Sequence, residues 1–201
     1  MSHVWECMVR NSPGGSLPLR VGIDARLVYY HPAGIARYCL QLMRALAEVD
    51  KEDQFVIFQS RRDAQQLISQ GNFQHRPLWT PSHHRLEQYL LSMELRFTPL
   101  DVLHSPDFIP PFRRRCRSII TIHDLNFLLY PQFLTKSSAR YYGQIDQAVR
   151  RTDHIIAVSE STRRDIVRLL GVPEQMITVI HEAPRRFFHR LPDIDLRPRL
   201  R

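Results

Sequence analysis

The sequence predicts an α/β domain with a Rossmann-like, doubly wound and mostly parallel sheet. Short apolar or β-branched runs alternate along the chain with longer segments of helical period, which is typical of βαβ units. The runs are continuously apolar, as expected of parallel strands that are covered on both faces. With 201 residues and 43% hydrophobic content, the chain can bury one core of ordinary size.

The first part of the chain predicts a strand, a helix and two further strands. Arg20–Asp24 is the first strand, and Gly34–Val49 is a helix because its apolar residues recur at helical spacing. Gln54–Gln59 is the next strand, Arg62–Ser69 a helix, and Phe73–Leu78 a weaker strand.

The segment His84–Phe97 predicts an amphipathic helix. Its residues Leu86, Leu90, Met93 and Phe97 share one face. A face of this kind normally packs against a core, so we expect these side chains to be buried.

The rest of the chain continues the alternation. Gly171 occupies the position that a helix C-terminus prefers, and Pro173 follows just beyond it. The predicted elements are the strands Asp101–Ser105, Arg117–Ile122, Asp153–Ser159 and Met176–Ile180, and the helices Ser137–Arg151 and Glu160–Gly171.

Polar residues follow four of the predicted strands, at the edge where ligands bind in open α/β sheets. Each has a simpler interpretation: the aspartates can fix loops, Ser159 can cap the next helix, and a single histidine is often a packing residue. Their shared position favours a cleft rim. The candidate rim residues are Asp24, His104, His123, Asp124, Ser159 and Glu160.

Gly34 opens a predicted helix after a loop that contains Pro32. A glycine at a helix N-terminus lets backbone N–H groups and the helix dipole meet an anion such as a diphosphate. The loop carries neither a G-x-G-x-x-G fingerprint nor a Walker pattern, so plain loop flexibility is the alternative.

The formal charge of +8 comes almost wholly from arginine, because Lys51 and Lys136 are the only lysines. Arginine favours phosphate and carboxylate partners. The charge is scattered and no nucleic-acid-binding motif is present, so we do not expect nucleic acid as a partner. The run Arg113–Arg117 is interpreted as a solvated loop. The alternative for the basic clusters is a surface that approaches anionic lipid or an acidic, lipid-linked acceptor.

The cysteines Cys7, Cys39 and Cys116 lie far apart and lack zinc-site spacing, so no metal site is predicted. Residues 1–19 are predicted to be a flexible leader without a secretory signal. The expected location is the cytoplasm, with peripheral contact at the inner face of the membrane as an open alternative.

Several segments, taken in order, resemble the N-terminal half of a retaining glycosyltransferase of family four. The resemblance covers residues 20–188 and implies one half of the two-domain GT-B fold. The segments that carry it are GIDARLVYYHPAGIARY, PLWTPSHHRLEQYLL, DVLHSPDFIPP, TIHDLNFLLYP and DHIIAVSESTRRDIVRLLGVPEQMITVI.

The resemblance implies that this domain holds a glycan, lipid or small-molecule acceptor, while a second domain grips a nucleoside diphosphate sugar without a bound metal. By motif match, His123 reaches the donor sugar and Gly34 approaches the donor diphosphate. Asp124 is expected to fix a turn, and Phe127 and Phe133 to pack a loop. The sequence departs from the family at Ala36, where relatives often carry a second glycine.

The second domain is not found in these residues, and residues 189–201 are expected to start an interdomain linker or form a truncated tail. The resemblance therefore implies the N-terminal half of a hexosyltransferase-type enzyme that has little activity alone. Truncation, a frameshift and a separate C-terminal subunit are the open explanations for the missing half. A non-catalytic module that binds a sugar or another acceptor is the alternative.

Overall fold

The computed structural model describes residues 17–84, 86–184 and 188. The predicted fold class is confirmed: one sheet of seven parallel strands runs in the order β3-β2-β1-β4-β5-β6-β7. Most of the predicted leader, and the predicted linker 189–201, lie outside the described residues. The strands are β1 Arg20–Asp24, β2 Gln54–Ser60, β3 Phe73–Leu78, β4 Val102–Ser105, β5 Arg117–Ile122, β6 His154–Ala157 and β7 Ile177–Val179.

The strand order reverses between β1 and β4, which are neighbours although two strands separate them in sequence. In doubly wound sheets, ligands bind beyond the carboxyl ends of the strands at such a point. The helices that connect the strands are α2 Leu27–Tyr30, α3 Gly34–Val49, α4 Glu87–Leu95, α5 Asn126–Leu129, α6 Lys136–Tyr142, α7 Ile145–Arg151 and α8 Glu160–Leu170, with the short 3-10 turns η1 Pro131–Phe133 and η2 Glu174–Met176.

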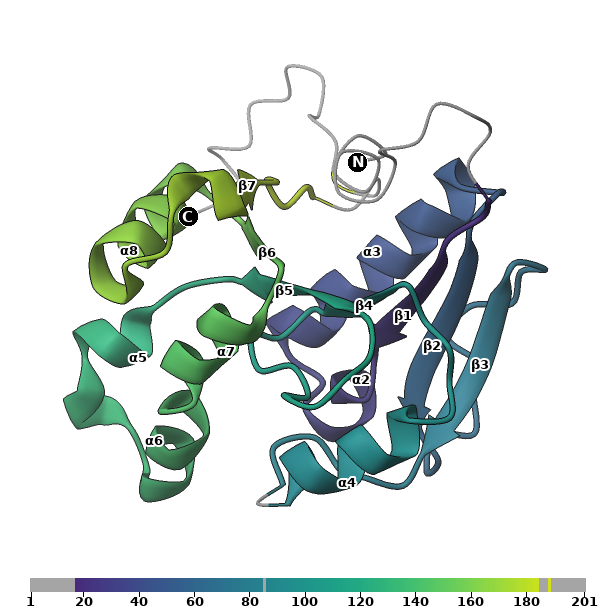
Figure 1. Ribbon diagram of the computed structural model, residues 1–201, viewed down its shortest axis with the longest axis horizontal. Helices are drawn as coiled ribbons and strands as arrows, with labels where there is room; N and C mark the ends of the chain where they lie inside the picture. The colour runs from purple at the N-terminus through teal and green to yellow at the C-terminus, as the bar shows by residue number, and fades with distance from the viewer. Residues whose placement is uncertain (1–16, 85, 185–187, 189–201) are drawn as a thin grey trace, which may run out of the picture.

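Helices cover both faces of β1 and β2 (Figure 1). On one face, α3 packs against the side chains of Val21, Ile23 and Ile57. On the other face, Leu91 and Leu95 of α4 pack against β2 and β4. Glycine lets β1 pack closely on this second face, because a Cβ at Gly22 would lie 2.7 Å from Leu100 and 2.8 Å from Phe58 and would displace a neighbouring side chain.

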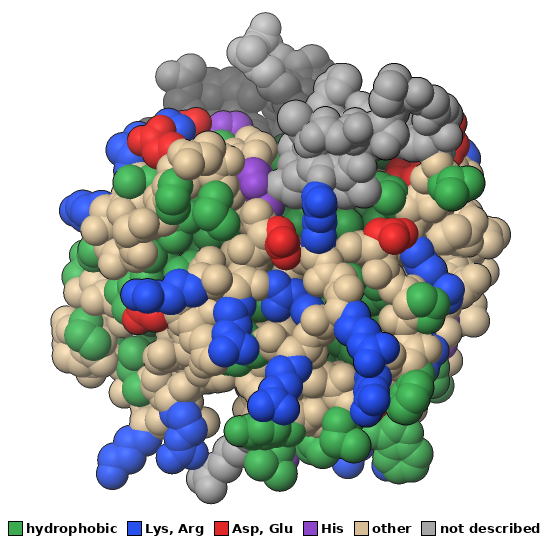
Figure 2. Space-filling model, viewed as in Figure 1, with side chains coloured by type: hydrophobic (Ala, Val, Ile, Leu, Met, Phe, Trp, Pro, Cys, Tyr) green, Lys and Arg blue, Asp and Glu red, His purple; other side chains and the backbone are tan. Residues whose placement is uncertain are grey.

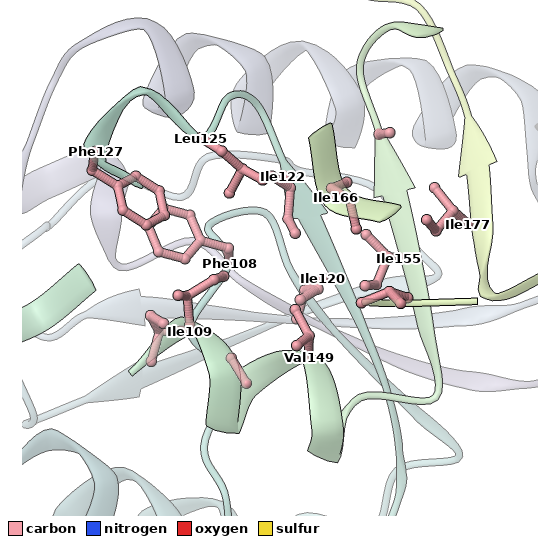
Figure 3. Packing of buried hydrophobic residues seen from close by; sticks show 14 residues of the cluster. Phe108, Ile109, Ile120, Ile122, Leu125, Phe127, Val149, Ile155, Ile166 and Ile177 are labelled. Carbon is pink, nitrogen blue, oxygen red and sulfur yellow. The ribbon is translucent and has the colours of Figure 1, made fainter. Parts of the chain in front are cut away.

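A further core lies around β5 and β6, next to the carboxyl ends of those strands. Ile120 and Ile155 are fully buried there, together with side chains of α7 and α8. The rings of Phe108 and Phe127 stack at one end of this core, with centroids 5.2 Å apart (Figure 3). This core therefore fixes the loops that follow β4 and β5.

The helix predicted over residues 62–69 is wrong. The described chain turns at Asp63, whose N–H donates to the carbonyl of Ser60, and then runs without helix to β3. The buried side chain of Gln59 holds this segment: its Nε2 donates to the carbonyl of Gln65 at 2.9 Å, and its Oε1 accepts from the N–H of Leu67 at 3.3 Å. Tertiary hydrogen bonds thus replace the local helical ones.

The helix predicted over residues 137–151 is divided into α6 and α7. Gly143 ends α6, and its N–H donates to the carbonyl of Ala139 at 2.9 Å. Glycine in a helix interior costs about 1 kcal/mol relative to alanine, which favours a break at this position.

The predicted packing of the α4 segment is also wrong. Leu86, Leu90, Met93 and Phe97 are exposed, whereas Leu91 and Leu95 are buried. Glu87 is buried too, because it forms an ion pair with Arg26. The helix therefore turns the side that carries Glu87 towards the sheet and leaves its other apolar side in solvent.

Candidate functional site

A pocket of about 590 Å³ lies at the carboxyl end of β5, between the start of α3 and the loops that follow β4 and β5. Most of its lining is aromatic or aliphatic, and a few polar side chains interrupt it. The lining residues are Ile35, Phe108, His123, Asp124, Asn126, Phe127, Tyr130, Phe133, Leu134 and Tyr142.

His123 stands at the end of β5 with both ring nitrogens engaged. Its Nε2 lies 3.0 Å from the carbonyl oxygen of Pro106, and its Nδ1 lies 3.0 Å from a carboxylate oxygen of Glu182. A carbonyl oxygen can only accept, so Nε2 is the donor in its contact with Pro106. The imidazole is thus held as a hydrogen-bond donor beside the pocket.

Two further contacts fix the orientation of His123. The ring of Tyr38, from α3, packs edge-on against the imidazole with centroids 4.9 Å apart. The hydroxyl of Thr162 donates to the carbonyl oxygen of His123 at 3.1 Å. Burial is the main reason why the pKa of Tyr38 is raised, so its hydroxyl stays protonated.

Ser159 is the N-cap of α8, the simpler of its two sequence interpretations. Its Oγ accepts from the N–H of Thr162 at 3.1 Å, which places Thr162 next to His123. Glu160 lies in the first turn of α8 and pairs with Arg163 at 2.8 Å. Neither Ser159 nor Glu160 belongs to the pocket lining.

His104 lies inside β4 and is completely buried, so the expectation that it stands on an open rim is wrong. Its Nε2 lies 2.9 Å from the hydroxyl oxygen of Thr121. Burial, with a smaller effect of His123, lowers the pKa of His104 to about 3, and the ring is therefore neutral. His104 supports β5 from behind the pocket.

Asp124 lines the pocket, and its Oδ1 accepts from the N–H of Asn126 at 2.9 Å. The expected turn after β5 is therefore present. Phe127 packs in the core as expected, but Phe133 is 80% exposed and projects into the pocket region without core packing.

Gly34 is the first residue of α3, and open space surrounds the position of a Cβ there. The long helix directs its first N–H groups and its dipole towards this space. The methyl group of Ala36 is buried inside the protein.

Asp24 does not line the pocket. Its carboxylate binds Arg26 through both oxygens, with Nε at 2.8 Å and Nη2 at 2.6 Å. Arg26 is 1% exposed and also binds Glu87 at 2.7 Å and the carbonyl of Thr80. Burial raises the pKa of Glu87 even though Arg26 opposes that shift. Sequence spacing gives no sign of this pairing, because 61 residues separate Arg26 and Glu87.

A second polar cluster lies behind Pro106 and was also missed from sequence. Asp107 binds Nε2 of His83 at 2.9 Å and the hydroxyl of Tyr141 at 2.8 Å. Burial opposes ionisation of Asp107, but these hydrogen bonds prevail and lower its pKa. His83 has a φ of 61°, and its ring stacks on His31 and packs on Tyr141. This ordered cluster supports the loop that carries Pro106.

These groups can bind a polar ligand that also has an apolar face. The aromatic walls offer flat apolar surfaces, and His123, Asp124 and Asn126 offer hydrogen bonds. Over residues 17–84, 86–184 and 188, no cluster of His, Cys, Asp and Glu side chains is arranged to hold a metal ion.

The fold and the pocket define an α/β domain with a pocket beside the topological switch point of its sheet. Residues 32–183 match the model of Glycosyltransferase Family 4, and the chain belongs to this family as an N-terminal domain. No curated protein matches the chain. One similar solved structure is a short chain dehydrogenase family protein from Francisella tularensis subsp. tularensis SCHU S4, with 9% identity, 79% of each chain covered and a TM-score of 0.38.

Proposed function

We propose that the pocket beside His123 binds the acceptor of a sugar transfer that retains the anomeric configuration. A second domain would hold the nucleoside diphosphate sugar, as the family resemblance implies. The observation that carries the proposal is His123 itself, a doubly hydrogen-bonded imidazole in the wall of an apolar pocket at the carboxyl end of β5.

The chemistry of transfer fits these groups. Negative charge grows on the departing diphosphate, so donors aimed at it lower the barrier. Gly34 leaves the N-terminus of α3 accessible to such an anion. The Nδ1 of His123 would exchange the half-exposed carboxylate of Glu182 for a hydroxyl of the donor sugar, while Asp124 and the aromatic walls hold the acceptor.

The second candidate is a binding module without transfer activity. It is favoured by the pocket itself, which combines aromatic walls with the polar side chains of His123, Asp124 and Asn126. Acceptor binding then needs no second domain, whereas transfer does. Peripheral membrane contact is a separate prediction, because it concerns a surface of the domain away from the pocket beside His123.

The test is a titration of the isotopically labelled 201-residue chain, followed by NMR. The probes are octyl β-glucoside and octyl α-mannoside below their micelle concentrations, with free glucose, UDP-glucose and GDP-mannose for comparison. At least one octyl glycoside is expected to shift the signals of Asn126 and Tyr142, because both residues line the pocket.

His123→Ala is expected to weaken this binding, and His181→Ala serves as a matched control at an exposed position. Glycoside shifts confined to residues outside the pocket would contradict the proposed acceptor site. Turnover of a nucleotide sugar by the chain alone would contradict the need for a second domain.

A further inference from the structure

The outer side of α4 is an exposed apolar surface. We define the α4 face as Tyr89, Leu90, Met93 and Phe97, of which Met93 is 67% and Phe97 77% exposed. The opposite side of the same helix is buried against β2 and β4. A helix that is apolar on both sides is normally covered on both sides, so the α4 face is suited to a partner.

A groove of about 980 Å³ adjoins the α4 face. Tyr89, Met93 and Phe97 line it on one side, and Phe112 and the segment Arg113–Cys116 line it on the other. Its charged lining residues are Asp101 and the five arginines Arg20, Arg96, Arg113, Arg114 and Arg115. Basic side chains gather beside hydrophobic ones over α4, at the lower edge of the view in Figure 2.

These arginines are largely available to an external anion. Arg96, Arg113 and Arg115 are exposed, and within the described part of the chain no carboxylate forms an ion pair with any of them. Arg114 is held by the carbonyl groups of Pro111 and Arg151 and lies 3.7 Å from Asp153.

The two nearby carboxylates, Glu94 and Asp101, accept hydrogen bonds from backbone N–H groups and form no ion pair with these arginines. The carboxylate of Glu94 accepts from the backbone N–H groups of Trp79 and Thr80, at 2.7 and 2.8 Å. A carboxylate oxygen of Asp101 accepts from the backbone N–H of Arg20 at 2.7 Å. The lining holds five arginines and one aspartate, so the groove has a net positive charge beside its apolar wall.

The groove is separate from the pocket beside His123. Arg20 is the first residue of β1, and Asp101 directly precedes β4, so the groove reaches the amino ends of strands whose carboxyl ends face the pocket. The six residues of β5 alone span roughly 20 Å between these two edges. An occupant of the groove leaves the pocket open.

We infer that the α4 face and its arginines bind the surface of a bilayer that contains anionic lipid. Aromatic and methionine side chains enter the boundary between head groups and acyl chains, where amphipathic rings are favoured. Guanidinium groups donate paired hydrogen bonds to lipid phosphates. The excess of positive charge, five arginines against Asp101, favours an anionic membrane over a protein surface of mixed charge. No helix of the described residues is long and apolar enough to cross a membrane.

The test is flotation of the 201-residue chain with vesicles of phosphatidylcholine alone, and with vesicles of equal parts phosphatidylcholine and phosphatidylglycerol. The chain is expected to float with the anionic vesicles only. Met93→Ser with Phe97→Ser, and separately Arg113→Gln with Arg115→Gln, should each lower the partition coefficient about tenfold or more. Circular dichroism establishes that each variant is folded.

Two controls match these changes. Val49→Ser removes an exposed apolar side chain on α3, and Arg44→Gln with Arg164→Gln removes two exposed arginines elsewhere. Neither control should change flotation by more than about twofold, because none of these three residues lines the groove. Equal losses in the control and α4 variants would overturn the inference. The inference would also be overturned if the chain bound no vesicles and instead formed a dimer that dissociates in the double variant Met93→Ser with Phe97→Ser.

Discussion

The Nε2 atom of His123 lies 3.0 Å from the carbonyl oxygen of Pro106, so the end of β5 is tied to the loop that follows β4. Pro106 precedes Asp107, which is itself fixed by His83 and Tyr141. The imidazole therefore has a defined direction before any ligand binds. Preorganisation of this kind lowers the cost of positioning a donor group during a reaction.

Arg26→Ala is expected to destabilise the domain by about 3–5 kcal/mol, because it leaves Asp24 and the buried Glu87 without their cation. Denaturation with urea measures the loss. Arg37→Ala, at an exposed position of α3, should change stability by less than about 0.5 kcal/mol. Similar effects of the two variants would contradict the structural role of the buried ion pairs.

Stability should fall as the pH drops below about 6.5, because the pKa of His104 is lowered from its ordinary value of 6.5 to about 3. In that window the unfolded chain binds a proton that the folded chain excludes, and the slope is about 1.4 kcal/mol per pH unit for one residue. His31 and His154, whose pKa values burial also lowers, act in the same direction.

The contribution of His104 to the pH dependence of stability is measured with the variant His104→Gln. Urea midpoints measured from pH 6.5 down to pH 4 should show a slope smaller than that of the wild type by about one proton. His181→Gln, at an exposed position, should leave the slope unchanged. An undiminished slope in His104→Gln would show that His104 does not exclude a proton on folding.

Phe133→Ala is expected to affect ligand binding, whereas Phe127→Ala is expected to affect stability. Phe133 is 80% exposed, so its removal should change stability by less than about 0.5 kcal/mol while weakening octyl glycoside binding. Phe127 stacks on Phe108 in the core, and its truncation should cost about 3–5 kcal/mol. Urea denaturation and NMR titration separate the two effects, and a large loss of stability in Phe133→Ala would refute this division.

Gly22→Val is expected to destabilise the sheet by about 1–3 kcal/mol or more through overpacking, because a Cβ at Gly22 already meets Leu100 and Phe58 below 3.0 Å. Gly71→Val is the comparison, since a Cβ at Gly71 meets no atom within 4 Å. Thermal unfolding measures both. The assigned packing would be wrong if Gly22→Val were no less stable than Gly71→Val.

Strands and helix ends could be predicted from sequence because their causes are local. Continuous β-branched runs such as residues 117–122 form buried parallel strands, and Ser159 and Gly171 cap α8 as their positions indicate. The segment 62–69 was mispredicted because the side chain of Gln59 supplies its hydrogen bonds.

The candidate site was predicted only in part, because much of it depends on contacts between distant residues. His123 and Asp124 line one pocket, as their shared strand end indicated. Glu182 reaches His123 from 59 positions away, and Arg26 joins Asp24 to Glu87. Helical periodicity placed Met93 and Phe97 on one face, but the buried pairing of Glu87 decides that this face points to solvent.

The most direct test of the proposed acceptor role is sugar transfer by the chain joined to a donor-binding domain of its family. Transfer should require both domains and retain the anomeric configuration, as read from the product by proton NMR. His123→Ala should lower kcat by about 100-fold or more, with His181→Ala unaffected. Equal activity of His123→Ala and the wild type, or full turnover by the chain alone, would contradict the proposal.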